Sequence, residues 1–319
     1  MTTRPKFSRS ERSGFTLVEL MVVITVIGLL VGMLVAAVIP VMTRAREAAI
    51  QFEMKQIEQS IENFRTENGF YPPSFQNISD AAALARYIGR IAPNHQEGNG
   101  APGTRIAIWW DTFGGNIQSD EGDDLVFWLS GLFKNAQFPL TNGATTPETM
   151  PSAFDDGTPG RNVYYEFRSN QLEARTVTDS SGNVVDGVEA EVAYYSQAAG
   201  VESPWLYIDS ASYDSGSTFD GYHILNNDPD FDHASGEMET RIYENPNTFQ
   251  LICAGIDKEL GPGSQWAIQS DEGGYEALDN FIDQNNGEDG LNASDNICNF
   301  CEGRLELLTT GVRESPAVQ

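Results

Sequence analysis

The sequence is poor in cysteine, in histidine and above all in positive charge. Three Cys in 319 residues are too few for a disulfide framework, and three His offer little for a metal centre. Nineteen Lys and Arg stand against 46 Asp and Glu, which gives a net charge of −27. Affinity for nucleic acid comes mostly from cations that neutralise phosphates, so this balance excludes nucleic acid as a partner.

The signatures of common enzyme classes are also missing. The chain has no Walker A loop, no G-x-S-x-G elbow and no H-E-x-x-H helix. Its many carboxylates make chance acid–base pairs easy to find, so such pairs carry little weight. Apolar residues make up 40% of the chain, which is enough for a folded core. We therefore expect a folded protein that is not an enzyme.

The few basic residues are concentrated at the N-terminus. Residues 1–14 hold four basic side chains and one Glu (+3), whereas residues 15–319 hold 15 basic and 45 acidic ones (−30). Leu20 to Thr43 is then a run of 24 residues without a charge, long enough to span a bilayer. Basic residues before such a span predict a cytoplasmic N-terminus and an outward body. A cleaved secretory signal is the alternative, but its apolar region is shorter, roughly 7–15 residues.

One carboxylate, Glu19, stands at the start of this apolar stretch. A charge inside a membrane costs about 2.5–3.5 kcal/mol on insertion scales, so Glu19 either reaches the interface or has a partner. The surrounding sequence, R-S-G-F-T-L-V-E-L-M-V-V-I from Arg12 to Ile24, closely resembles the leader and N-terminal helix of type IV pilins and type II secretion pseudopilins.

This resemblance implies how the N-terminus is processed and used. A prepilin peptidase would cut between Gly14 and Phe15 on the cytoplasmic side, and the new N-terminal Phe15 would be N-methylated. Glu19 matches the family residue that pairs with the N-terminal amine of a neighbouring subunit during filament assembly. A buried carboxylate and a buried ammonium are each costly alone and offset one another as a pair, so the pair favours one stagger between subunits.

The apolar run continues into an amphipathic helix. One stripe repeats at intervals of three and four residues, and its members are Ile50, Met54, Ile57, Ile61 and Phe64. Asn68-Gly69 reads as a helix stop, because Gly adopts the left-handed conformation, and Pro72-Pro73 prevent continuation. The pattern predicts one helix from Thr16 to about Asn68 whose second half packs on a globular head.

These patterns predict an α+β, pilin-like fold, in which the long N-terminal helix packs on an antiparallel β-sheet head with long loops. The expected organisation is a leader (1–14), a membrane or filament-core helix (15–43), its amphipathic half (44–69) and an extracytoplasmic head (70–319) with an acidic C-terminal loop (253–300). Within the head we expect a helix at 79–92, with Ser79 or Asp80 as its N-cap, and a second helix at 123–133. We also expect a loop at 93–104, a hairpin from 172–177 and 184–195, and strands at 163–168, 205–209 and 222–225.

The acidic C-terminal loop resembles the calcium loop of major pseudopilins. Residue by residue, Asp257 matches the first acidic ligand and Asp295 the second, and Ser294 is a candidate to complete the shell. Calcium takes six to eight oxygen ligands in flexible geometry, which suits carboxylates and carbonyls from such a loop. The resemblance thus implies calcium as a cofactor, and a solvated acidic loop without an ion is the alternative.

Two other groups of residues leave alternatives open. Cys253 and Cys298 flank the acidic loop and Cys301 follows it, so one disulfide involving Cys298 is expected, although the sequence does not say which pair forms. The aromatic pairs at 109–110, 164–165 and 194–195 are expected to be core or cross-strand residues, with an exposed adhesive patch as the alternative.

The segment N-G-F-Y-P-P, residues 68–73, resembles the corresponding segment of the major pseudopilin. The resemblance implies a filament-forming pseudopilin of a type II secretion system, anchored by a single pass in the bacterial inner membrane with its head in the periplasm. Implied partners are further copies of the chain in a filament, other pseudopilins, the prepilin peptidase and the inner-membrane assembly platform. A minor or adhesive type IV pilin is the alternative, since the head is larger than is typical of a major pseudopilin.

Overall fold

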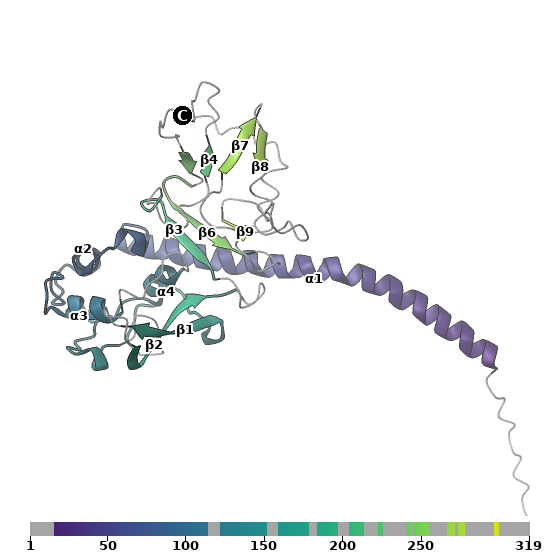
Figure 1. Ribbon diagram of the computed structural model, residues 1–319, viewed down its shortest axis with the longest axis horizontal. Coiled ribbons are helices and arrows are strands. Elements are labelled where there is room, and N and C mark those ends of the chain that lie inside the picture. Colours follow the sequence, from purple (N-terminus) through teal and green to yellow (C-terminus); the bar gives the residue numbers. More distant parts are fainter. Residues whose placement is uncertain are drawn as a thin grey trace, which may run out of the picture. The chain divides into compact units, whose positions relative to one another are not determined.

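A computed structural model of the chain describes residues 16–113, 122–151, 159–178, 184–196, 204–213, 223–225, 241–243, 245–254, 267–271, 274–277 and 297–299 (Figure 1). The chain divides into two compact units, Met1–Ala45 and Arg46–Gln319. The boundary between them falls inside one long helix.

That helix, α1, runs from Leu17 to Asn68 and confirms the predicted span. It stops where the sequence predicts, because Gly69 has a φ of 80° and its N–H bonds to the Arg65 carbonyl at 2.7 Å. Trp128 Nε1 and the Tyr207 hydroxyl then donate to the carbonyls of Pro73 and Pro72, each at 2.7 Å. Two buried aromatic side chains thus hold the chain as it leaves the helix.

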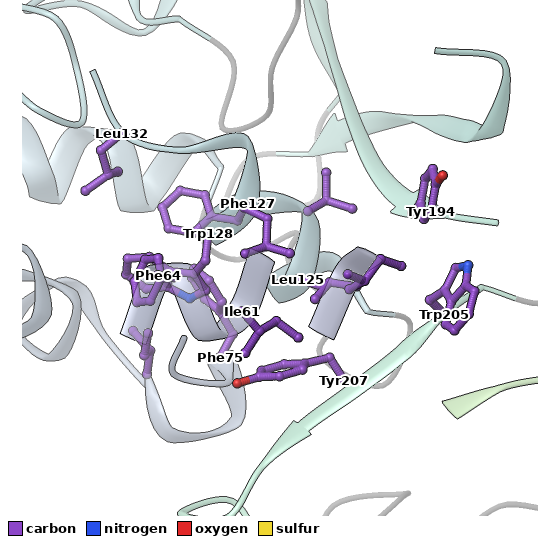
Figure 2. Close-up of a cluster of buried hydrophobic side chains, with 14 of the residues drawn as sticks. Ile61, Phe64, Phe75, Leu125, Phe127, Trp128, Leu132, Tyr194, Trp205 and Tyr207 are labelled. Carbon is purple, nitrogen blue, oxygen red and sulfur yellow. The ribbon is translucent and has the colours of Figure 1, made fainter. Parts of the chain in front are cut away.

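The core of the head forms around the apolar stripe of α1 (Figure 2). All five stripe residues, Ile50 through Phe64, are at most 4% exposed. Aromatic side chains from several elements pack with them, among them Phe75, Phe127, Trp128, Tyr194 and Tyr207. Phe64 and Trp128 meet edge to face with ring centroids 5.9 Å apart. The stripe therefore supplies one wall of an aromatic-rich core, as its spacing predicts.

Short helices cover this core. Helix α2 (Ala81–Ile91) is capped by Asp80, whose Oδ1 accepts a 2.6 Å hydrogen bond from the Ala83 N–H, so the predicted helix and its cap are confirmed. Helix α4 (Asp123–Ser130) is also confirmed, although it ends three residues earlier than expected because Gly131 takes a φ of 82°. Single 3₁₀ turns, η1, η4 and η5, lie at Phe75–Asn77, Pro147–Thr149 and Ser169–Gln171.

Helix α3 (Arg105–Thr112) is absent from the sequence prediction. It is only eight residues long, contains two adjacent Trp, and its N-cap, Thr104, makes no side-chain capping hydrogen bond. Local propensity is weak in such a segment, so burial decides its structure. Trp109 is fully buried in the core, and so the adjacent tryptophans are helical core residues rather than a cross-strand pair.

The described strands form three sheets. Strands β1 (Leu172–Thr178) and β2 (Val184–Tyr194) make the predicted antiparallel hairpin. Strands β3 (Leu206–Asp209), β6 (Phe249–Cys253) and β9 (Ile297–Cys298) are antiparallel in that order. The third sheet has the order β5-β4-β7-β8, from Arg241–Tyr243, His223–Leu225, Ala267–Asp271 and Gly274–Ala277. The α+β class is confirmed, and among the described strands only β4 and β7 pair in parallel.

The strand predicted at 163–168 is wrong. The N–H groups of Tyr164 and Tyr165 both bond to the Leu129 carbonyl near the end of α4, at 2.9 and 3.1 Å. The Asn162 N–H bonds in the same way to the Leu132 carbonyl. The N–H groups of this segment thus bond to carbonyls near the end of α4 that have no partner inside the helix. The order of aromatic and polar residues in the segment does not reveal this pairing. The two tyrosines are partly buried against the core, as is Trp110, whereas Trp109, Tyr194 and Tyr195 are buried.

Candidate assembly site on the N-terminal helix

The first turn of α1 is closed by a reciprocal pair, Thr16 and Glu19. The Thr16 N–H and its hydroxyl each donate to Glu19 Oε2 at 2.8 Å, and the Glu19 N–H donates to Thr16 Oγ1 at 3.2 Å. This is a capping box, in which the N-cap side chain and the third helical residue satisfy each other's backbone donors. Glu19 therefore has a local partner within its own chain, which the sequence analysis did not identify.

The capping box lies at the start of an exposed apolar stretch of α1. Leu17–Val35 is long and apolar enough to cross a membrane, and none of it is buried within the protein. Its side chains are widely exposed, for example Leu17 at 75% and Met33 at 64%. A stretch of this kind needs lipid or other apolar helices around it. The Glu19 carboxylate is thus the acidic group at one end of an apolar helix surface.

The processing residues Gly14 and Phe15 lie outside the described residues. The amide of Thr16 belongs to the capping box, and cleavage before Phe15 would leave that amide in the chain. The cap is therefore compatible with the processed as well as the unprocessed N-terminus.

A second carboxylate, Glu53, joins α1 to the head. Its Oε1 accepts hydrogen bonds from the Tyr194 hydroxyl at 2.6 Å and from Gln171 Nε2 at 3.1 Å, and its Oε2 accepts one from Ser196 Oγ at 2.9 Å. The burial of Tyr194 and its bond to Glu53 raise the pKa of that phenol. In the sequence Glu53 is only an acidic residue off the apolar stripe, so no local signal reveals this role.

The candidate calcium ligands Asp257, Ser294 and Asp295 also lie outside the described residues. The strands on either side of them are described, and they are adjacent. Cys253, the last residue of β6, is the register partner of Ile297, the first residue of β9. Asp257 follows this pair by four residues and Asp295 precedes it by two. The chain therefore leaves β6 toward Asp257 and enters β9 after Asp295 at the same end of one strand pair.

The exit of β9 is fixed to α1 and to β6. The Leu251 N–H donates to Asn299 Oδ1 at 3.0 Å, and the Asn299 N–H donates to the Leu251 carbonyl at 3.1 Å. Asn299 also bonds to Glu58 of α1, which lowers the pKa of that carboxyl, although burial outweighs the bond and leaves this pKa raised. The strand that ends the acidic loop is thus attached directly to the long helix.

The two described cysteines are not joined to each other. Cys298 is the register partner of Ile252, and Cys253 is the next residue along β6. Successive side chains of a strand point to opposite faces, so Cys253 and Cys298 face opposite sides of the sheet. A Cys253–Cys298 staple across the loop is therefore wrong, whereas a bond between Cys298 and Cys301 stays a prediction because Cys301 lies outside the described residues.

Acidic groups are also buried inside the head. Asp124 of α4 and Asp209 of β3 are 0% and 6% exposed, and Ser74 lies between them. The Ser74 hydroxyl bonds to Asp124, and the Ser74 N–H donates to Asp209 Oδ2 at 3.1 Å. Burial raises the pKa of both carboxyls, most strongly that of Asp124, which also has Asp123 and Asp209 as acidic neighbours. The arrangement holds α4, β3 and the segment after α1 together, but the burial of ionisable carboxyls opposes this stabilisation.

An apolar pocket of about 400 Å³ opens on the head. Its described lining includes Phe64, Ile91, Leu132, Phe133 and Pro139, with Tyr164 and Lys134 among its polar members. The Tyr164 hydroxyl donates to Glu67 Oε2 at 2.8 Å, and burial together with this carboxylate raises the pKa of Tyr164 to about 12.

No group of three or more His, Cys, Asp or Glu that could hold a metal occurs within the described part of the chain.

Comparisons with known proteins agree with the N-terminal geometry. Residues 9–35 match the prokaryotic N-terminal methylation motif. A segment of 92 residues is 27% identical to the type II secretion system core protein G of Pseudomonas aeruginosa. That segment covers 29% of this chain and 63% of the length of that protein, so most of the head lies outside the similarity. No solved structure matches the chain.

The methylation motif begins before the described helix and includes the capping box and the exposed apolar span. Both features fit a single-pass anchor in the bacterial inner membrane. Proteins of this kind are structural subunits rather than a known enzyme family. The N-terminal motif and the similarity over 92 residues to a core pseudopilin support an assignment of the chain to the type IV pilin-like proteins and pseudopilins.

Proposed function

We propose that the chain is a filament-forming pseudopilin of a type II secretion system. The observation that carries this proposal is the similarity to core protein G, combined with a carboxylate, Glu19, at the N-terminal end of an exposed apolar helix. The similarity favours the secretion branch of the family over the pilus branch. Subunits would leave the membrane into a periplasmic filament whose growth drives protein export.

The N-terminal amine and Glu19 would supply the register of this filament. The prepilin peptidase would remove residues 1–14 on the cytoplasmic side, where the basic leader is held, and Phe15 would carry the N-methylated ammonium. In the membrane Glu19 is satisfied by the capping box. When subunits pack, its second oxygen remains available to the ammonium of a neighbour, and the pair compensates the desolvation of both charges.

The acidic C-terminal loop would bind calcium through Asp257, Ser294 and Asp295. The adjacency of β6 and β9 supports this proposal, because it brings the two ends of the loop together. The attachment of Asn299 to α1 and β6 means that an ordered loop would stabilise the contact between sheet and helix. Calcium would therefore act as a structural ion of the head, with no catalytic role.

The proposed partners are further copies of the chain, other pseudopilins, the prepilin peptidase and the inner-membrane assembly platform. The alternative is a minor or adhesive type IV pilin, which the size of the head outside the 92-residue similarity favours. Trp109 and Tyr194, which such a role would use as exposed adhesive aromatics, are instead buried.

The experiment compares Glu19→Ala and Glu19→Gln in the full chain, produced with a type II secretion apparatus. Gln keeps an acceptor for the Thr16 N–H, whereas Ala removes it, and both remove the charge. We expect both variants to lose filaments in sheared fractions and electron micrographs, with heads that resist protease as in the wild type. Filaments at wild-type levels from Glu19→Gln would show that the cap, and not the ion pair, is what assembly requires.

A further inference from the structure

The face of α1 that points away from the head core carries one large exposed aromatic residue, Phe52. Phe52 is 65% exposed, although the stripe residues Ile50 and Met54, two positions to either side, are buried. At 100° per residue these positions lie on the opposite side of the helix. Three of its neighbours one turn away, Ala48, Ala49 and Gln56, are exposed and uncharged, and the fourth is the exposed Lys55. A partner that covers Phe52 therefore meets one charged neighbour, Lys55, among otherwise uncharged side chains.

The apolar pocket lies in the same compact unit, Arg46–Gln319, but at a different place on its surface. Five of its lining residues are exposed, so the pocket is open to solvent: Pro93, Asn94, Lys134, Ala136 and Asn162. Phe64, Leu132 and Phe133 form apolar walls inside it. Its volume of about 400 Å³ is ample for an aromatic side chain.

The charges beside the two features are complementary. Lys55 is exposed one turn from Phe52 on α1, and the exposed Glu67 lies beside the pocket, where it accepts hydrogen bonds from Tyr164 and Asn162. Neither Lys55 nor Glu67 takes part in an ion pair within the described residues, where Arg65 and Glu62 make such a pair. A neighbour that presents Phe52 to the pocket can place an ammonium near this carboxylate.

We propose that Phe52 of one subunit inserts into the apolar pocket of the next copy of the chain. A knob and a pocket at different places on one molecule make a heterologous contact, which leaves a free knob at one end and a free pocket at the other. Such a contact generates rings or open helical assemblies rather than closed dimers. The inference rests on the proposed filament and adds to it a contact between heads, separate from Glu19.

The first test uses point variants of the full chain in the same filament assay. Phe52→Asp places a charge in the apolar pocket and is expected to reduce sheared filaments at least tenfold, whereas Phe52→Leu retains them. Gln59→Asp is the matched control, because Gln59 is an exposed residue on the same helix face two turns away. We expect it to assemble as the wild type does. Equal filament yields from Phe52→Asp and Gln59→Asp would overturn the proposed contact.

The second test detects the contact itself. Chains with Phe52→Cys and Ala136→Cys together are treated with a short bismaleimide, in filaments and in membranes, and each single variant is treated in parallel. A ladder of adducts that needs both cysteines is expected. Filaments that form without such a ladder would overturn the inference and leave the proposed function standing. A ladder in membranes from cells that never make filaments would overturn the proposed function and support the contact.

Discussion

The Glu53 carboxylate accepts a 2.6 Å hydrogen bond from the Tyr194 hydroxyl, so a residue of α1 is tied to β2 across 141 positions of sequence. The same carboxylate also holds Gln171 and Ser196. Both flanks of the β1–β2 hairpin are therefore attached to the long helix at one point.

Replacement of this carboxylate should destabilise the head. Glu53→Ala removes the acceptor of the Tyr194 hydroxyl and of the buried Ser196 hydroxyl, whereas the Gln171 amide still donates to the Tyr195 carbonyl. We therefore expect a loss of about 2–3 kcal/mol in the free energy of unfolding. Tyr194→Phe should lose about 1 kcal/mol, since it removes one hydrogen bond. The measurement is urea unfolding of the full chain in detergent, followed by tryptophan fluorescence. Lys55→Ala, at an exposed position two residues away, is the control, and a loss no larger than in that control would contradict the prediction.

Two glycines with similar positive φ values should respond differently to substitution. Gly131 and Gly103 have φ values of 82° and 84°. A Cβ at Gly131 would collide with the Asn162 carbonyl, whereas one at Gly103 would meet open space. Gly103→Ala is expected to cost about 1 kcal/mol from the left-handed backbone alone, and Gly131→Ala more than about 2 kcal/mol. Unfolding experiments under the conditions above distinguish the two, and equal losses would show that the collision is relieved at no cost.

The buried carboxyl Asp124 should make the head less stable as the pH rises. Because its pKa is raised in the folded chain, ionisation costs more in the folded than in the unfolded state. Stability is therefore lost from the ordinary Asp pKa, about 4, upward toward the raised folded value. Asp124→Asn should be more stable than the wild type at pH 7, by at least about 1 kcal/mol, and close to it at pH 4.

Urea unfolding at pH 4 and pH 7 measures whether Asp124→Asn raises or lowers the stability of the head. Asp111→Asn is the matched control, because Asp111 is exposed on α3. It should change stability little at either pH. An Asp124→Asn chain that is less stable than the wild type at pH 7 would mean that the ionised carboxylate makes a favourable interaction in the head.

Removal of calcium should destabilise the head if the acidic loop holds the ion. A calcium concentration 100-fold above Kd stabilises a folded protein by about 2.7 kcal/mol, which a chelator would remove as a fall in Tm. Asp257→Ala and Asp295→Ala should abolish the response to the chelator, whereas Asp111→Ala should keep it. The measurement combines thermal unfolding of the full chain with metal content by mass spectrometry. Bound calcium that survives both loop substitutions would place the ion elsewhere.

Local sequence patterns predicted α1 and α2 correctly, because the structure of these helices depends on residues that are close in the sequence. The stripe from Ile50 to Phe64 predicts the buried face of α1, and Gly69 predicts its end, because spacing and backbone conformation are local properties. Asp80 likewise predicts the cap of α2. The strand predicted at 163–168 failed since its hydrogen bonds go to the Leu129 carbonyl, a partner that no local pattern identifies.

By itself the sequence determined the resemblance to type IV pilin-like proteins, the uncharged apolar run and the position of Glu19, because a motif and an uncharged run need no tertiary context. Only the tertiary structure decided what the carboxylates of the head contact, with Glu53 bonded to Tyr194 and Asp124 to Ser74. It also decided that Phe52 is exposed and that distant residues form the apolar pocket. The physical reason is that burial and hydrogen bonding depend on which distant segments meet, and that is set by the packing of the whole head around α1.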